Sequence, residues 1–162
     1  GSNSSEGLWI ANLTGKPLKD ATNILWFESA YDAMAEYQIN PVKSVYVSTG
    51  GTPTKGQIKG MLEETRQASH YLGFDKDEAG RGFVKNFKTT AKEMGFADCM
   101  VQAYHPLGQY KDWNDALLGK KDQRLIDQGE IDFDYIQFAK EQEAEKLQEQ
   151  AKQEERTSGY RR

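Results

Sequence analysis

The chain has 162 residues, of which 37% are hydrophobic and 28% charged, and its formal net charge is −4. No stretch approaches the ~20 consecutive apolar residues of a membrane-spanning helix, and the 11% aromatic content argues against a disordered chain. The single cysteine excludes a disulfide scaffold and a cysteine-rich zinc site. We therefore expect a folded domain in a reducing, cytoplasmic compartment, and not one that coats itself in nucleic acid through bulk charge alone.

We expect four segments along the chain. Residues 1–20 form an N-terminal extension with a candidate edge strand at 8–10, and residues 21–120 form the main domain. A C-terminal helical extension follows over 121–156, with a solvated helix from about residue 132, and 157–162 form a loose tail. Residues 139–162 hold six basic and six acidic side chains, so the net negative charge belongs to the folded body.

The main domain alternates short apolar runs with helical patterns. Four buried strands are predicted, at 24–27, 45–47, 71–74 and 99–104, and each of the first three is followed by an apolar stripe at helical spacing. The stripe residues are Ala30, Ala33, Met34 and Tyr37, then Ile58, Met61, Leu62 and Thr65, then Phe83, Phe87, Ala91 and Met94. This alternation predicts an α/β fold with right-handed crossovers and a four-stranded, mostly parallel sheet flanked by helices.

Carboxylates follow three of these four strands. Glu28 ends the first strand, the segment 75–77 (Asp-Lys-Asp) ends the third, and the segment 111–115 (Lys-Asp-Trp-Asn-Asp) follows the fourth. The carboxyl ends of parallel strands share one edge of the sheet, where ligands bind in open α/β folds. Asp32 and Glu36 continue the acidic series on the first helix, one turn apart.

Crowded carboxylates repel one another unless a cation neutralises them, and hard oxygen ligands suit Mg²⁺ or Mn²⁺. Such ions also bind substrate phosphates, which indicates phosphoryl chemistry. The alternative for each acid alone is an ordinary surface turn or a solvated helix face. The coincidence of several acids at one edge favours the metal site.

Glycines and cations near the same edge are candidates for phosphate binding. Gly50, Gly51 and Thr52 lie between the second strand and its helix, where free backbone N–H groups can meet a phosphate. Four cations recur at spacings of four, three and four on the helix after the third strand: Arg81, Lys85, Lys88 and Lys92. This stripe can contact a nucleic-acid backbone, although a solvated face is an equally good interpretation.

Taken together, these motifs resemble the Toprim domain of bacterial primases, topoisomerases and some nucleases. The segment 27–33 resembles the family's first motif, with Glu28 after a strand and Asp32 one turn later, and Gly51-Thr52 matches the residues that close its second strand. The segment 74–81 (FDKDEAGR) resembles the Asp-x-Asp motif in its primase form, and 111–117 (KDWNDAL) resembles the acidic segment that follows the fourth strand. The resemblance spans roughly residues 22–118.

The resemblance implies a role for each matching residue. Glu28 is the expected general acid/base of nucleotidyl transfer or strand cleavage, and Asp75, Asp77, Asp32 and Asp112 are the expected ligands of Mg²⁺ or Mn²⁺. The expected contacts to nucleotide or nucleic-acid phosphates are Gly51, Thr52, Arg81, Lys85 and Lys111. The implied partners are DNA or RNA, nucleotides, and other domains of a longer replication or mobilisation protein.

Three residues depart from the family pattern. Ser29 stands where glycine is usual, Lys76 separates the two aspartates where primases often have a small residue, and Asn114 replaces an expected aspartate. The segment around Asn114 looks like the Toprim-like modules of plasmid and mobile-element proteins. Primase-like nucleotidyl transfer is the favoured function, and a non-catalytic DNA- or partner-binding module and a Toprim nuclease are the alternatives.

Four other residues have the side chains of functional sites. We expect His70 to be structural, Cys99 to be a buried strand residue, and Trp113 to cover the core. His105, at the end of the fourth strand, has the better position of the two histidines for lining a site.

Overall fold

The computed structural model describes residues 6–106, 108–127 and 135–159. Within this described part of the chain, five strands form one sheet in the order β1-β3-β2-β4-β5. The strands are β1 (Trp9–Asn12), β2 (Asn23–Phe27), β3 (Val45–Ser48), β4 (Ser69–Leu72) and β5 (Val101–Ala103). β1 pairs antiparallel with β3 and all other pairs are parallel, which confirms the predicted α/β fold and the N-terminal edge strand.

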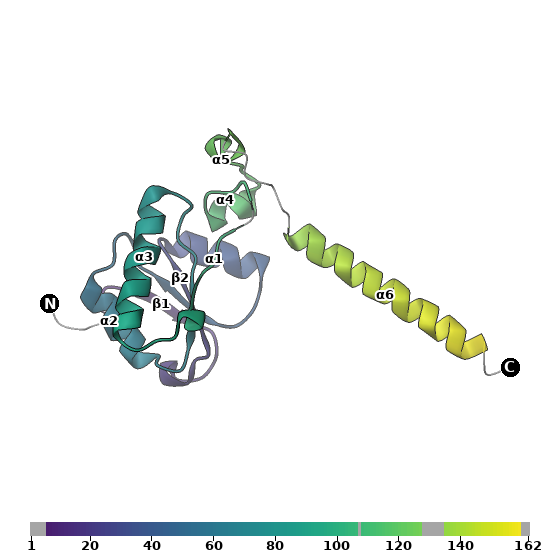
Figure 1. Cartoon of the computed structure of the whole chain (residues 1–162), viewed down its shortest axis with the longest axis horizontal. Coiled ribbons are helices and arrows are strands. Elements are labelled where there is room, and N and C mark those ends of the chain that lie inside the picture. The colour runs from purple at the N-terminus through teal and green to yellow at the C-terminus, as the bar shows by residue number, and fades with distance from the viewer. Residues whose placement is uncertain (1–5, 107, 128–134, 160–162) are drawn as a thin grey trace.

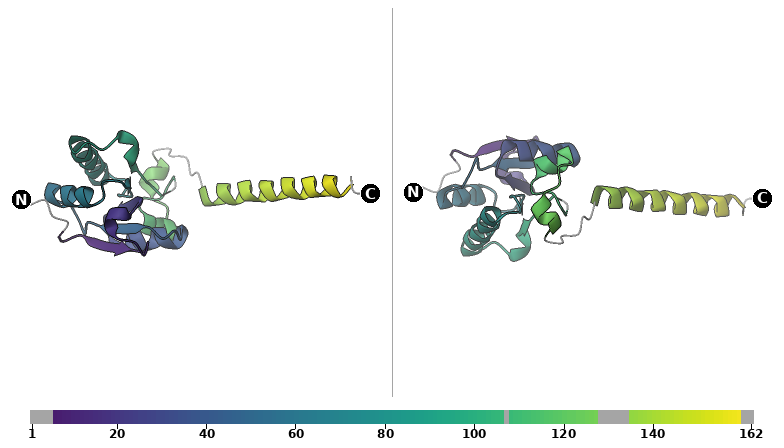
Figure 2. Two further views of the ribbon diagram at one scale, coloured as in Figure 1. Left: turned by 90° about the horizontal axis from the view of Figure 1, so that it is seen from below. Right: turned by 90° about the horizontal axis from the view of Figure 1, so that it is seen from above.

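Helices α1 (Ala30–Ile39) and α4 (Trp113–Leu118) cover one side of the sheet, and α2 (Lys55–Glu64) and α3 (Glu78–Glu93) cover the other (Figure 1 and Figure 2). Helices α5 (Gln123–Asp127) and α6 (Tyr135–Gly159) follow α4, and short 3₁₀ turns lie at Leu18–Asp20 and Asp98–Met100. Among the described residues, no helix combines the length and the apolar composition that crossing a bilayer requires.

Both faces of the sheet are buried, which is why the central strands read as unbroken apolar runs. Ile24 and Trp26 of β2 face α2 and α3 in one core cluster, whereas Leu25 and Phe27 face α1 and Trp113 in another. The predicted apolar stripes of α2 and α3 lie in the first cluster or pack against it, except Thr65, which is the C-cap of α2 and is buried beside His70. The core position expected for Trp113 is also confirmed.

The topology creates a switch point between β2 and β4. The chain leaves β2 for α1 on one face of the sheet, whereas it leaves the adjacent strand β4 for α3 on the other face. Ligands bind in open α/β sheets where neighbouring connections diverge in this way. The residues that follow β2 and β4 therefore border the candidate site.

The predicted bounds of two strands and the predicted burial of two residues are wrong. β4 begins and ends two residues before the predicted strand, so Gly73 and Phe74 lie beyond it. β5 starts only at Val101, after a 3₁₀ turn that contains Cys99 and turns this residue outward, so Cys99 is exposed and not a buried strand residue. Met34 is 47% exposed and does not belong to the buried stripe of α1.

The C-terminal helix α6 exists and ends at Gly159, beyond the expected end at residue 156. Its expected start at about residue 132 lies outside the described residues, as do residues 160–162 of the predicted tail. In Figure 1, α6 is drawn apart from the sheet and its flanking helices. Charged side chains cover its described surface, in agreement with a solvated helix.

Candidate metal centre and nucleic-acid interface

Three aspartates meet beyond the carboxyl ends of β2 and β4. Asp32 lies in the first turn of α1, Asp75 lies three residues after β4, and Asp112 is the N-cap of α4. Each offers one carboxylate oxygen, and these oxygens all lie within 4.8 Å of one another. The structure thus brings together three of the four metal ligands expected from the sequence, over a separation of 80 residues along the chain.

Asp75 is the least satisfied member of this acidic group. Its Oδ1 atom is buried and has no hydrogen-bond partner among the residues that the structure describes. Burial, together with the charges of Glu28, Asp32, Asp112 and Asp77, raises the pKa of Asp75 to about 7. A divalent cation would supply the missing partner and neutralise the neighbouring charges, so these residues fit Mg²⁺ or Mn²⁺.

Asp32 is held in place by two elements. The hydroxyl of Ser29 donates to its Oδ2 atom at 3.0 Å, and the backbone N–H of Asn114 donates to its Oδ1 atom at 3.0 Å. Burial raises the pKa of Asp32, although the bond from Asn114 opposes that rise. The Asn114 bond joins α1 to α4, so it also fixes the position of the Asp112 loop relative to Asp32.

The expected acid/base residue, Glu28, lies beside the acidic group. Its Oε1 atom accepts a hydrogen bond of 3.2 Å from the backbone N–H of Asp75. Burial raises the pKa of Glu28, and the charges of Asp77 and Asp32 add to that rise, while Lys111 and the bond from Asp75 oppose it. A raised pKa brings a carboxyl closer to the range in which it exchanges a proton at neutral pH.

Asp77 lies outside the group of three. Its Oδ1 atom accepts from the backbone N–H of Gly80 at 2.7 Å and so caps α3, and its Oδ2 atom lies 3.7 Å from Nζ of Lys111. The structure therefore gives the second aspartate of the Asp-x-Asp motif a capping and ion-pairing position.

The loop between Asp75 and α3 depends on a glycine. A Cβ atom at Gly80 would overlap the carbonyl oxygen of Asp75, so no larger residue fits there without moving the loop. From the sequence alone, Gly80 was only one residue of the segment 74–81 that matches the Asp-x-Asp motif. The backbone of Asp75 folds directly over this position, which makes Gly80 necessary for the placement of the Asp75 carboxylate.

Lys76 joins the two loops that supply Asp75 and Asp112. Its backbone N–H donates to the carbonyl of Lys111 at 2.9 Å, and its Nζ atom donates to the carbonyl of Gly108 at 2.9 Å. The departure of Lys76 from the family pattern thus has a local structural explanation, because its ammonium group is directed to a backbone carbonyl of the neighbouring loop.

Ser29, which also departs from the family pattern, makes two hydrogen bonds with Asp32. Its hydroxyl oxygen accepts from the backbone N–H of Asp32 at 3.2 Å as the N-cap of α1, in addition to donating to the Asp32 carboxylate. We did not assign Ser29 to the site from the sequence. The signal was present, since a serine three residues before an acid at the start of a helix is a capping pattern.

Glu36, one turn after Asp32, does not join the acidic group. Both residues are buried, so the solvated acidic face considered as an alternative is wrong. The Oε1 atom of Glu36 accepts from the hydroxyl of Tyr104 at 2.8 Å and lies 3.5 Å from Nδ2 of Asn40. Burial raises the pKa of Glu36. This residue connects α1 to the segment after β5, on the same side of the sheet as α4.

The predicted phosphate contacts are accessible. Gly51 and Thr52 are exposed in the loop before α2, where Gly50 and Gly51 adopt the positive φ angles of +63° and +134°. Arg81 and Lys85 are exposed on α3, and Lys111 is about one-third exposed beside Asp77. Their contact with phosphate remains a prediction.

The two histidines occupy different environments. His70 is fully buried between Trp26 and Thr65, which confirms the structural role expected for it, and burial lowers its pKa to about 4. His105 is exposed after β5 and is absent from the three-carboxylate group.

A family model described as Toprim-like matches residues 25–117. This chain belongs to the Toprim-like family. The match contains Glu28 and all three aspartates of the acidic group, and the family supports a role in nucleic-acid processing.

Two solved structures are similar to this chain. The primase fragment of the bacteriophage T7 primase-helicase protein is 22% identical, with a TM-score of 0.49, and the similarity covers 79% of this chain and 50% of that one. A DNA primase domain from Pseudomonas aeruginosa is 17% identical, with a TM-score of 0.47 and a coverage of 73% and 36%. This chain therefore spans half or less of each. No curated protein sequence matches it significantly.

Proposed function

We propose that this domain binds Mg²⁺ or Mn²⁺ and carries out primase-like nucleotidyl transfer on nucleic acid. The observation that carries the proposal is the convergence of Asp32, Asp75 and Asp112 within 4.8 Å, with Glu28 hydrogen-bonded to the backbone of Asp75. In this proposal the three aspartates hold the ion. When bound, a divalent cation polarises phosphoryl oxygens and stabilises the charge that develops on them.

Glu28 is the proposed general acid/base. Its Oε1 atom is held by the N–H of Asp75, which leaves Oε2 to take or give the proton of the reacting hydroxyl. Partial burial and the neighbouring acids raise its pKa, so the carboxyl is better matched to proton exchange near neutral pH than a solvated glutamate.

The cations around the site orient the substrate in this proposal. Lys111, about one-third exposed and next to Asp77, is the proposed contact to a nucleotide phosphate, and Arg81 and Lys85 extend the positive charge along α3. The backbone N–H groups of Gly51 and Thr52 offer a second phosphate contact. We propose that other domains of a longer replication or mobilisation protein supply the template and further nucleotide contacts.

Incorporation of labelled nucleotides on a single-stranded template in the presence of Mg²⁺ tests the proposal. We expect Glu28→Gln to abolish incorporation while leaving Mn²⁺ binding intact. Glu36→Gln is the matched control, because it makes the same chemical change at a buried glutamate outside the acidic group, and it should retain activity. Equal incorporation by the Glu28→Gln and wild-type proteins would contradict the assignment.

The same assay separates the alternatives. Shortening of the labelled strand in place of nucleotide addition indicates a Toprim nuclease. Binding of the strand without any chemical change, unaffected by Glu28→Gln, indicates a non-catalytic binding module.

A further inference from the structure

The cations of α3 form one exposed face that leads away from the acidic group. At 3.6 residues per turn, Arg81, Lys85, Lys88 and Lys92 fall within an arc of about 60° and span about 16 Å along the axis. All four are exposed, whereas Phe87 and Ala91 on the other side of the helix are buried in the core. The face begins beside Asp77, the N-cap of α3, and ends at the opposite edge of the sheet.

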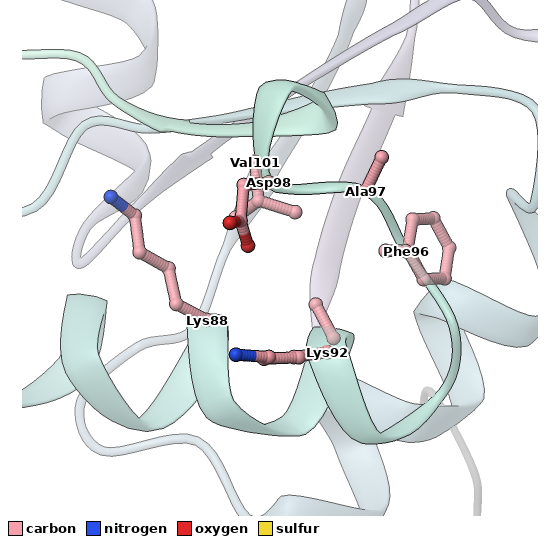
Figure 3. Close-up of a pocket in the computed structure, with 7 residues that line it drawn as sticks. Lys88, Lys92, Phe96, Ala97, Asp98 and Val101 are labelled. Atoms are coloured by element: carbon pink, nitrogen blue, oxygen red, sulfur yellow. The ribbon is translucent and has the colours of Figure 1, made fainter.

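A pocket lies at the far end of this face, next to the start of β5. Its volume is about 360 Å³, and Lys88 and Lys92 form one wall. Phe96 and Val101 contribute an apolar floor, and Asp98 lies opposite the lysines. Figure 3 shows the Asp98 carboxylate facing the side where the two ammonium groups project.

The charges of this pocket favour an anion that also presents apolar surface. Two ammonium groups outnumber a single carboxylate, so the pocket carries a net positive charge in a chain whose net charge is −4. The apolar floor offers contact to a part of the ligand that is not charged. A phosphodiester group with its attached sugar has both properties.

We propose that the pocket between Lys88, Lys92 and Val101 binds a phosphodiester group of a single-stranded nucleic acid that runs along α3 from the acidic group. The course of this strand rests on the proposed function, since it begins at the metal site. The face from Arg81 to Lys92 is long enough to contact more than one phosphate of such a strand. Cations that track a strand in this way are typical of sites that bind single strands without sequence preference.

Fluorescence anisotropy with a labelled single-stranded DNA of about 12 nucleotides, long enough to cover the whole face from Arg81 to Lys92, tests this pocket in the presence of EDTA. We expect Lys88→Ala/Lys92→Ala to weaken binding about tenfold at low salt and to reduce the slope of log K against log salt by about 0.7, the value for one lost phosphate contact on a single strand. Asp98→Asn should strengthen binding, because it removes the negative charge that opposes the strand.

Lys16→Ala/Lys43→Ala is the matched control, since it removes two exposed lysines far from α3 and should leave the salt slope within error of wild type. Equal affinity and slope in the Lys88/Lys92 and control variants would overturn the proposal, and so would weakening by Asp98→Asn. Competition by an acidic peptide that exceeds competition by unlabelled DNA would assign the pocket to a protein partner instead. Mn²⁺ binding and nucleotide incorporation are measured separately, so failure of the pocket and failure of the proposed function give different results.

Discussion

Two buried polar clusters in this domain differ in how completely their hydrogen bonds are made. Around His70, Trp26 Nε1 donates to Nδ1 at 3.0 Å, Nε2 lies 3.2 Å from the hydroxyl of Thr65, and that hydroxyl donates to the carbonyl of Met61 at 2.6 Å. In the acidic group, Asp75 keeps a buried oxygen without a partner among the described residues.

This difference separates a structural cluster from a candidate ligand site. A buried polar group that is fully hydrogen-bonded specifies the packing around it, whereas an unsatisfied one costs free energy. Carboxylates crowded at a sheet edge lower the stability of the metal-free protein, and a cation offsets that cost. The same fold thus contains a cluster that stabilises it unaided and a cluster that needs a ligand.

The largest expected effect comes from Gly80, which supports the acidic group. Gly80→Ala places a Cβ atom against the carbonyl of Asp75, so we expect the free energy of unfolding to fall by about 3 kcal/mol. Gly82→Ala is the control on the same helix, because nothing in the described part of the chain lies within 4 Å of the point that its Cβ atom would occupy, and it should stabilise the protein by about 0.5–1 kcal/mol. Chemical denaturation measures both, and equal effects would contradict the account of the loop.

The His70 cluster should make stability depend on pH. Burial lowers the pKa of His70 to about 4, below the unfolded value of about 6.5, so the unfolded chain takes up this proton first as the pH falls. The contribution of His70 is fully present above pH 6.5 and is lost between pH 6.5 and pH 4, by at most about 3 kcal/mol.

Denaturation curves across this pH window should differ between the wild type and His70→Asn. The asparagine amide can bond to Trp26 and Thr65 but does not titrate, so the variant should lack this part of the pH dependence. Identical pH profiles for the two proteins would show that His70 does not titrate on unfolding.

Asp77 tests whether the second aspartate of the motif acts as a cap or as a metal ligand. Asp77→Ala should cost about 1 kcal/mol of stability through loss of the N-cap of α3. Asp77→Asn keeps a capping oxygen and should retain both stability and Mn²⁺ affinity. Loss of Mn²⁺ binding in Asp77→Asn with stability unchanged would instead make Asp77 a ligand.

Lys76 has the smallest expected effect. Lys76→Met removes the bond from Nζ to the carbonyl of Gly108, which should cost about 0.5 kcal/mol and slightly weaken Mn²⁺ binding by loosening the Asp112 loop. Lys76→Arg retains a donor and should behave like wild type. Tighter Mn²⁺ binding in Lys76→Met would show that the ammonium charge opposes the ion.

Sequence patterns predicted the sheet because its central strands are buried on both faces and its helices carry regular apolar stripes. The motifs also located Glu28, Asp32, Asp75 and Asp112 at one edge, since parallel strands deliver their carboxyl ends together. These predictions depend on the spacing of apolar residues and on the order of strands and helices along the chain. Both can be recognised in a single sequence.

The details that the sequence did not predict depend on local turn geometry and on contacts between distant segments. Asp77, expected among the ligands, also caps α3 next to Lys111, and the sequence did not indicate that position. Cys99 was expected in a buried strand, but it lies in a 3₁₀ turn and is exposed. Glu36 was expected in the acidic series of α1, with a solvated face as the alternative, but it is buried and accepts a hydrogen bond from Tyr104, 68 residues away.

Calorimetric titration of the metal-free protein with Mn²⁺ tests the proposed metal centre most directly, because it requires no knowledge of the substrate. We expect saturable binding by the wild type, loss of that binding in Asp75→Asn, and retention in the control Asp20→Asn, which makes the same change at an exposed aspartate outside the acidic group. Binding of Mn²⁺ by Asp75→Asn as tightly as by the wild type would contradict the claim that Asp32, Asp75 and Asp112 form a metal centre.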